Sequence, residues 1–139
     1  MNTLLFLGDS ITDCNHCFDP ENLGYGYVRK ISDALRTADV DHQIRNFGYD
    51  GFTVSALRRL WKRHCLALSP DFITILIGIN DMIFNWEHQS GSDPDRYEKI
   101  YRLLLDEVLS ENPDIDILGS YIEEFKSADN SSIGVRETP

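Results

Sequence analysis

Segments that resemble strands, each followed directly by a glycine, occur at four places along the chain. Thr3–Leu7 and Phe72–Ile77 are short apolar runs, and the second is rich in β-branched residues. His42–Phe47 is a weaker strand candidate of mixed composition, and Asp116–Leu118 is a plausible fourth. Continuous apolar runs of this length are typical of strands that are buried on both faces. The pattern therefore predicts four strands in a buried, parallel sheet.

Between the predicted strands, apolar residues recur every three or four positions, which is the spacing of an amphipathic helix. Helices are expected over Tyr27–Leu35, Val54–Trp61 and Tyr97–Val108. The alternation of strands and helices with short connections is typical of right-handed βαβ units. It predicts an α/β fold, a three-layer α/β/α sandwich in which helices cover both faces of a parallel sheet.

The length of 139 residues suits one domain with a single hydrophobic core. We expect this domain to span residues 1–120. Residues 121–139 include the polar run Ser127–Ser132 and show no apolar periodicity. This last segment is therefore expected to be a polar tail or an irregular segment.

Acidic residues outnumber basic ones, because 23 Asp and Glu against 13 Lys and Arg give a formal net charge of −10. Such a charge repels phosphate backbones and anionic lipid head groups, so neither nucleic acid nor a membrane is an expected partner. The apolar run Leu4–Leu7 near the amino terminus is too short for a signal peptide or a membrane span. A cytoplasmic location is expected.

Cys14, Cys17 and Cys65 are an odd number of cysteines in a chain without an export signal, so free thiols are expected rather than disulfides. Cys14 and Cys17 have the Cys-x-x-Cys spacing of zinc sites. A structural zinc site needs a second pair of ligands, and His64 next to Cys65 on a predicted helix is a poor substitute. No metal and no cofactor are expected.

Glycines and polar residues follow three of the predicted strands at their carboxyl edge, where open parallel sheets bind ligands. Each segment alone has a structural interpretation, with Ser10 as a helix N-cap, the glycines as turn residues and Asn80 with Asp81 as a capping pair. Convergence on one edge favours a catalytic site instead. The segments are Gly8-Asp9-Ser10, Asn46-x-Gly48-x-x-Gly51-x-Thr53 and Gly78-Ile79-Asn80-Asp81.

These three segments, in this order, resemble the SGNH, or GDSL-type, ester hydrolase family, which includes bacterial lipases and acylhydrolases. The resemblance extends from the first strand to about Gly119 and implies a flavodoxin-like fold. It implies that Ser10 is the nucleophile and that the N–H groups of Ser10 and Gly51 and the side-chain amide of Asn80 form an oxyanion hole. The implied reaction is cofactor-free, two-step hydrolysis of a small-molecule acyl ester, with esters on carbohydrates as one candidate substrate.

Three further residues are assigned to the same edge. Asp9 and Asp81 are interpreted as carboxylates that order or cap the loops of the site, and together with Trp86 they are expected to form its substrate-binding part. Trp86 and other aromatic residues near this edge could stack on a sugar ring, although aromatic residues at such spacing are more often part of a core.

A serine hydroxyl needs a base to take its proton, and this base is usually a histidine. The family that the segments resemble carries it in an Asp-x-x-His block near the carboxyl terminus, and no such block follows the third segment. His42 opens a strand and lies about 17 to 20 Å from the edge that holds Ser10. His64 is expected to be carried away from this edge by its helix. His16 and His88 remain as candidate bases.

Two explanations are open for the missing block. The favoured one is a truncated or frame-shifted reading of a longer hydrolase gene, so that the last strand and helix of the fold are absent. The other is a shortened, catalytically inactive relative that binds a ligand in the same crevice. With the truncation, the fourth strand is expected to be an unprotected edge of the sheet, which favours self-association.

Overall fold

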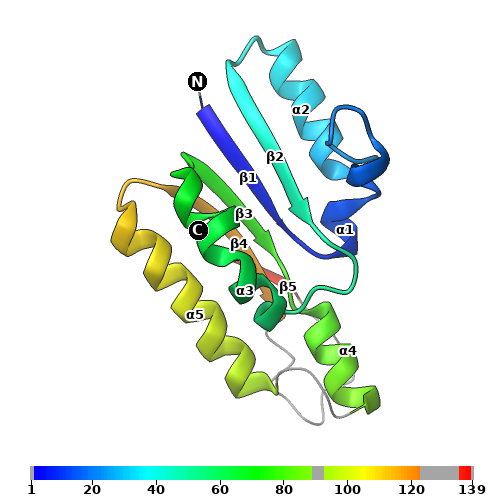
Figure 1. Ribbon diagram of the computed structural model, residues 1–139, viewed down its shortest axis with the longest axis vertical. Helices are drawn as coiled ribbons and strands as arrows, with labels where there is room; N and C mark the ends of the chain where they lie inside the picture. Colours follow the sequence, from blue (N-terminus) through cyan, green and yellow to red (C-terminus); the bar gives the residue numbers. More distant parts are fainter. Residues whose placement is uncertain (1, 89–92, 123–134, 139) are drawn as a thin grey trace.

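The computed structural model describes residues 2–88, 93–122 and 135–138. A five-stranded sheet in the order β2-β1-β3-β4-β5 lies at its centre (Figure 1). Strands β2, β1, β3 and β4 pair in parallel with one another, whereas β5 runs antiparallel to β4. The predicted parallel sheet is therefore confirmed over four strands. The strands are β1 (Asn2–Gly8), β2 (His42–Gly48), β3 (Phe72–Leu76), β4 (Asp116–Ile122) and β5 (Val135–Thr138).

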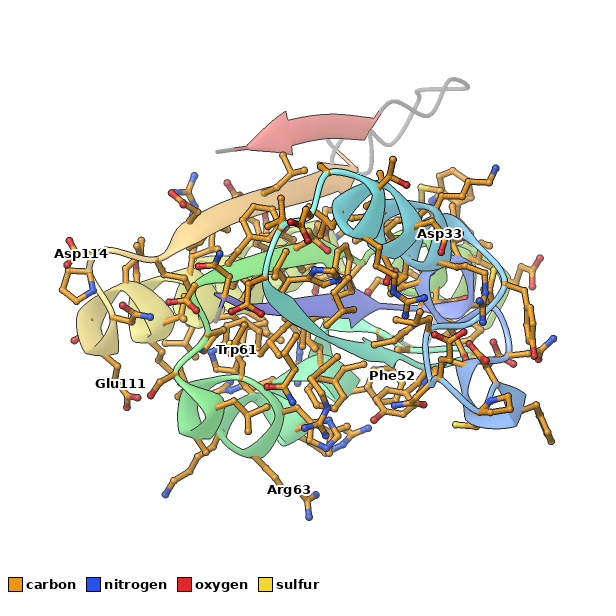
Figure 2. The ribbon with its side chains drawn as sticks, turned by 90° about the horizontal axis from the view of Figure 1, so that it is seen from above. Asp33, Phe52, Trp61, Arg63, Glu111 and Asp114 are labelled. Atoms are coloured by element: carbon orange, nitrogen blue, oxygen red, sulfur yellow. The ribbon has the colours of Figure 1, made fainter. Side chains whose placement is uncertain are left out.

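Helices connect the parallel strands and cover both faces of the sheet. α2 (Tyr27–Thr37) lies on one face, and α3 (Val54–His64) and α5 (Pro94–Glu111) lie on the other (Figures 1 and 2). The predicted α/β/α layering is therefore confirmed. The shorter elements are α1 (Ser10–Asp13), α4 (Ile79–His88) and the 3-10 turns η1 (His16–Phe18) and η2 (Leu66–Leu68).

Alternate residues of β1 supply the two halves of the hydrophobic core. Leu5 and Leu7 are buried together with side chains of α3 and α5, whereas Phe6 packs with Val28 of α2 in a smaller cluster. Successive side chains of a strand point to opposite faces of a sheet. A strand that is covered on both faces is therefore apolar at every position, which explains the continuous apolar run at the start of the sequence.

The two longer helices on the α3 and α5 face begin at side-chain caps. Thr53 accepts a hydrogen bond from the backbone N–H of Ala56 at 3.2 Å and starts α3. Asp93 accepts one from the N–H of Arg96 at 2.9 Å, and Pro94 occupies the first position of α5. Both arrangements satisfy N–H groups that have no partner within the helix. α3 therefore begins directly after the glycine-containing turn that follows β2.

The region expected to be a polar tail contains strand structure, which corrects the sequence-based interpretation of residues 121–139. β4 continues to Ile122, past the expected boundary at residue 120, and β5 pairs with its Gly119–Ile122 segment. A short antiparallel pair needs only backbone groups, so its sequence need not show an apolar pattern. The edge of β4 that was expected to be wholly unprotected is partly covered. The polar run 127–132 lies outside the described residues.

Candidate active site

The ends of three neighbouring strands are level with one another. Gly8 at the end of β1 pairs with Gly48 of β2 on one side and with Leu76 of β3 on the other. The segments that follow these three residues therefore leave the sheet at the same edge. This register brings the three sequence segments together, as the sequence analysis expected.

Ser10 is the first residue of α1, directly behind the end of β1. Its side chain is exposed, and its hydroxyl has no hydrogen-bond partner among the residues that the structure describes. The N-cap of this one-turn helix is Asp9, whose Oδ1 accepts a hydrogen bond from the N–H of Ile11 at 3.0 Å. The nucleophile candidate is thus presented to solvent by a capped turn.

Asp9 is buried, with 1% of its surface exposed. Burial raises the pKa of its carboxyl group above the ordinary value, and the negative charge of Asp50 adds to this, although hydrogen bonds from the N–H groups of Ile11 and of Asp9 itself oppose the rise. A side chain so enclosed cannot contact a substrate. The assignment of Asp9 to substrate binding is therefore corrected to the alternative role of loop ordering.

A tight turn from Tyr49 to Phe52 carries Gly51. The N–H of Tyr49 donates to the carbonyl of Gly8 at 3.1 Å, and the N–H of Phe52 donates to the carbonyl of Tyr49 at 3.2 Å. Gly51 has a φ of +75°, and no heavy atom lies within 4 Å of the position that a Cβ would occupy. Only glycine adopts this conformation without strain. The missing side chain leaves open space beside the backbone N–H.

Asn80 lies in the first turn of α4, immediately after β3. Its Nδ2 donates a hydrogen bond to the carbonyl of Phe52 at 3.0 Å. A carbonyl oxygen can only accept, which identifies this atom as the amide nitrogen. The amide has a second N–H, so one of its donors holds the Gly51 turn and the other is available for a ligand.

Asp81 is fully buried, with 0% of its surface exposed. Its Oδ2 accepts a hydrogen bond from the N–H of Val54 at 2.9 Å, at the start of α3. Asp81 is a capping carboxylate that ties α4 to α3, so its assignment to substrate binding is also corrected. Trp86 is 53% exposed and follows Asn80 by six residues, about 9 Å along α4. Its role in substrate binding remains a prediction.

His16 is not placed as a base for Ser10. Its side chain is buried, its Nε2 lies 2.9 Å from the carbonyl oxygen of Gly48, and its Nδ1 lies 2.8 Å from Oδ1 of Asn22. Because the carbonyl of Gly48 only accepts, Nε2 has to carry a hydrogen and cannot take the proton of Ser10 through that atom. His16 is therefore corrected from candidate base to hydrogen-bond donor.

The other histidines are also distant or engaged. His42 pairs with Asn2 at the amino end of the sheet, as expected. His64 is closer to the edge than expected, because its ring stacks on Phe47 with centroids 4.4 Å apart. Burial lowers the pKa of His64, and Arg63 and Arg45 lower it further. The backbone of His88 ends α4, about 12 Å along the helix from the Asn80 position, and its side chain lies outside the described residues.

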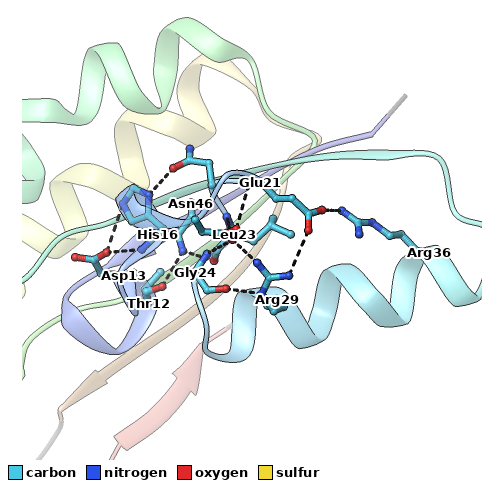
Figure 3. A network of polar contacts seen from close by, with 11 residues as sticks. Thr12, Asp13, His16, Glu21, Leu23, Gly24, Arg29, Arg36 and Asn46 are labelled. Atoms are coloured by element: carbon cyan, nitrogen blue, oxygen red, sulfur yellow. Dashed lines mark hydrogen bonds and ion pairs between the residues drawn. The ribbon is translucent and has the colours of Figure 1, made fainter.

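A buried polar network behind the site was not recognised from the sequence. Asn46 has 0% of its surface exposed, and its Nδ2 donates to the carbonyls of Thr12 and Leu23, each at 2.8 Å. Its Oδ1 accepts from the N–H of Gly48 at 2.8 Å. Asn46 thus joins the end of β2 to α1 and to the loop before α2 (Figure 3). The available signal was an asparagine two residues before the glycine that ends the strand.

Asp19 organises the loop that precedes α2. Its carboxylate accepts hydrogen bonds from the N–H groups of Leu23 and Gly24, each at 3.0 Å, and pairs with Arg29. Burial alone would raise the pKa of Asp19, but hydrogen bonds from the backbone of this loop and from Arg29 lower it below the ordinary value. The loop packed against Asn46 is therefore itself rigidly held.

A cleft of about 690 Å³ lies between α2 and the start of β2, with Arg36, His42 and Ile44 in its lining, and it contains none of the three segments. Within the described part of the chain, no group of three or more His, Cys, Asp or Glu side chains is arranged to hold a metal ion. No helix in that part is both long and apolar enough to cross a membrane.

The sequence matches the GDSL-like Lipase/Acylhydrolase family over residues 6–136. It is 41% identical over 87 residues to an acetylxylan esterase of Geobacillus stearothermophilus, a match that covers 57% of this chain and 39% of the esterase. The fold is similar to a solved structure of an acetylxylan esterase from that organism, with a TM-score of 0.75 at 31% identity, covering 84% of this chain and 58% of that one.

A structure described as a GDSL-like lipase from Parabacteroides merdae is similarly close, with a TM-score of 0.77 at 33% identity. It is matched over 85% of this chain and 58% of its own length. Structures have also been solved of variants of the Geobacillus esterase in which a serine, an aspartate or a histidine is replaced by alanine, each described as a catalytic mutant. The match over residues 6–136 covers nearly the whole sequence. The chain belongs to the GDSL-like lipase/acylhydrolase family.

Proposed function

We propose that this chain carries the nucleophile and the oxyanion hole of a serine ester hydrolase. The observation that supports the proposal is the level ending of β1, β2 and β3, because the segments with Ser10, Gly51 and Asn80 all follow these strand ends. The hydrogen bond from Asn80 to Phe52 connects two of these segments directly. Acyl transfer requires hydrogen-bond donors that are already in position, because negative charge develops on the carbonyl oxygen in the transition state.

In the proposed reaction, Oγ of Ser10 forms a bond to the carbonyl carbon of the ester. The N–H groups of Ser10 and Gly51 and the free N–H of the Asn80 amide donate hydrogen bonds to the resulting oxyanion. When the tetrahedral intermediate collapses, the bond to the alcohol oxygen breaks and the alcohol leaves with a proton. Water then attacks the acyl-Ser10 intermediate, releases the carboxylic acid and restores the serine hydroxyl.

The weak point of the proposed reaction is the base. Of the three histidine side chains that the structure describes, those of His16, His42 and His64, none contacts Ser10. The chain spans 39% of the length of the Geobacillus esterase in sequence and 58% of the similar solved structures. With the described side chains alone the proton of Ser10 would pass to water, and we propose that hydrolysis by these residues is slow.

We propose acetyl groups on neutral sugars as the substrate class. The similarity to an acetylxylan esterase supports this choice, and so does the open space at Gly51, which admits a small acyl group beside the N–H donor. The net charge of −10 disfavours anionic substrates. Exposed apolar side chains near the site, Ile11 and Trp86, offer surfaces for the face of a sugar ring.

The test is covalent labelling of the chain with a fluorophosphonate probe, together with hydrolysis of an acetylated xylo-oligosaccharide. Labelling should map to Ser10 and disappear in Ser10→Ala, and hydrolysis should exceed the uncatalysed rate. Adducts at Ser55 or Ser69, or equal labelling of Ser10→Ala, would refute the assignment of the nucleophile. Binding of the oligosaccharide without labelling or hydrolysis would instead support a catalytically inactive binding module.

A further inference from the structure

His16 is buried in the loop behind Ser10 and has defined contacts on several sides. Its exposed surface is 4%, and its ring packs edge-on against Tyr49 with centroids 5.7 Å apart. The backbone N–H of His16 donates to Oδ1 of Asp13 at 3.2 Å, and the same carboxylate oxygen lies 3.6 Å from Nε2. A polar ring held this firmly in a small domain has a specific structural role.

That role centres on Gly48, the last residue of β2. Its N–H donates to Oδ1 of Asn46 at 2.8 Å, and its carbonyl accepts from Nε2 of His16 at 2.9 Å. A Cβ at this position would lie 2.4 Å from the backbone nitrogen of Asp13, so the backbone of α1 packs directly on Gly48. Both polar groups of one peptide residue are therefore fixed by buried side chains, and the residue itself is fixed by packing.

Gly48 is the residue from which the turn carrying Gly51 begins. The next N–H, that of Tyr49, is held by the carbonyl of Gly8, and the turn closes with the hydrogen bond from Phe52 to Tyr49. The direction of the Gly48 carbonyl sets the plane of the peptide that joins Gly48 to Tyr49. A change in this plane would rotate the whole turn relative to Ser10.

We propose that His16 is a positioning residue, whose Nε2–H holds the Gly48 carbonyl and thereby aims the Gly51 N–H at the point where Ser10 attacks. The inference rests on the proposed function, because it assumes that Gly51 and Ser10 act on the same carbonyl group. His16 acts through Gly48 and Tyr49 and does not touch the substrate. Its place in the loop after Ser10 lets one side chain couple the nucleophile segment to the oxyanion segment.

The test compares three variants of the full chain, His16→Gln, His16→Asn and His16→Leu. The amide nitrogen of a glutamine side chain reaches about as far as Nε2 of histidine, whereas the asparagine amide is one methylene shorter and reaches only as far as Nδ1. Glutamine can therefore donate to Gly48 and asparagine cannot. Leucine fills the space but leaves the Gly48 carbonyl without its donor.

Two readouts are measured on each variant. The first is the rate of Ser10 labelling by the fluorophosphonate probe, which we expect to fall about tenfold in His16→Leu and His16→Asn, because the Gly48 carbonyl then lacks its donor and the turn loses its fixed direction. The second is amide hydrogen exchange, which should accelerate at Tyr49 and Phe52 but not in α5. His16→Gln should restore both readouts to near the original values.

A merely structural role predicts a different result, namely equal losses of thermal stability in all three variants with unchanged labelling and unchanged exchange at Tyr49 and Phe52. That result would overturn the inference. Hydrogen exchange does not depend on catalysis, so it separates the proposal on His16 from the proposed function.

Unlabelled Ser10 in the original chain would refute the proposed function. In that case, unchanged exchange in His16→Leu would also refute the link between His16 and the turn, and accelerated exchange would support it.

Discussion

The side-chain amide of Asn80 donates a hydrogen bond to the backbone carbonyl of Phe52 at 3.0 Å, joining the segment after β3 to the turn after β2. The two proposed oxyanion donors that do not belong to Ser10, the Gly51 N–H and the Asn80 amide, are therefore connected through this hydrogen bond. One N–H of Asn80 is used for this connection, which orients the other. A single side chain thus both builds the turn and serves the proposed chemistry.

Replacing Asn80 with alanine should slow the labelling of Ser10 and ester hydrolysis by about 10² to 10³-fold, the usual effect of losing one oxyanion donor. Asn80→Asp should slow both to a similar degree, because a carboxylate has no N–H to donate to the oxyanion or to Phe52. Rates are measured with a simple acetyl ester and with the fluorophosphonate probe. A loss of less than threefold in both variants would exclude Asn80 from the oxyanion hole.

Replacing either of two glycines, Gly48 and Gly51, with alanine should lower the stability of the fold, but by different amounts. A Cβ on Gly48 would meet the backbone nitrogen of Asp13 at 2.4 Å, so Gly48→Ala should lower the free energy of unfolding by about 3 kcal/mol or more. Gly51 has open space around the Cβ position, so Gly51→Ala should cost only the strain of its φ, about 1 to 2 kcal/mol.

Gly51→Ala should lose activity without losing the fold. The new methyl group of Gly51→Ala would occupy the space beside the proposed N–H donor, so the rate of Ser10 labelling should fall even though the protein remains folded. Denaturant unfolding and labelling rates are measured side by side for Gly48→Ala and Gly51→Ala. Equal stability losses in the two variants would contradict the placement of the glycines.

Asp9→Asn should stabilise the protein at neutral pH. Burial holds the pKa of Asp9 in the folded state above the ordinary value of 3.8, so its favourable contribution is present at low pH and is lost as pH rises through the raised pKa. Asparagine keeps the oxygen that accepts from Ile11 but never ionises. The melting temperature of the variant should exceed that of the original chain at pH 7, and the difference should disappear below about pH 3.8.

The control for this experiment is Asp33→Asn, which changes an exposed carboxylate on α2 and removes the same charge from the surface. Thermal unfolding is followed at several pH values for both variants. If Asp33→Asn raised the melting temperature as much as Asp9→Asn, a general reduction of the negative charge would be the cause, and burial of Asp9 would not.

The three thiols should react at very different rates. Cys17 is exposed and Cys14 is partly exposed, whereas Cys65 is buried. Burial raises the pKa of Cys65 to about 12, so almost none of it is thiolate at pH 8, and only the thiolate is reactive. A thiol-reactive disulfide reagent should modify Cys17 rapidly in the native protein, and Cys65 only after addition of denaturant. Modification is read by mass spectrometry, and rapid native modification of Cys65 would contradict its burial.

The outer edge of β4 should support self-association. β5 pairs with Gly119–Ile122, so the backbone groups of Asp116–Leu118 on that edge have no strand partner in the described part of the chain. Leu118 is 41% exposed there. Edge strands of this kind pair with other chains. Light scattering after size-exclusion chromatography should detect oligomers, and Leu118→Lys should shift them toward the mass of one chain. Absence of oligomers in the unaltered chain would refute the expectation.

The sequence was sufficient to predict the parallel sheet because buried strands such as β1 are apolar at every position. It was not sufficient for β5, a four-residue strand whose sequence, Val135–Thr138, has no apolar run. The positions of Ser10, Gly51 and Asn80 at one edge were predictable because each follows a strand. Asp9 and Asp81 were partly misassigned, because whether a loop carboxylate faces solvent or a helix N-terminus depends on packing between distant segments.

His16 illustrates the same limit. Its proximity to Ser10 in sequence suggested a base, but the structure turns its ring toward Gly48, 32 residues away in sequence. No local pattern indicates that contact, since it depends on β2 lying beside β1. Asn46 is similar, because the carbonyls that it binds belong to residues 12 and 23, far from it in sequence, in the segment that connects β1 to β2.

The order of the strands also determines when the candidate active site, at the carboxyl ends of β1, β2 and β3, can be completed as the chain folds. β1 pairs with β3 from Leu4↔Phe72 onward, a separation of 72 − 4 = 68 residues, and Asn80 comes into place only when this pairing has formed. Pairings between distant segments are slow, because the entropy of closing a long loop is lost before the contacts form. Acquisition of reactivity at Ser10 during refolding should therefore lag behind the formation of helices, so that the chemistry of one serine reports the last long-range step of folding.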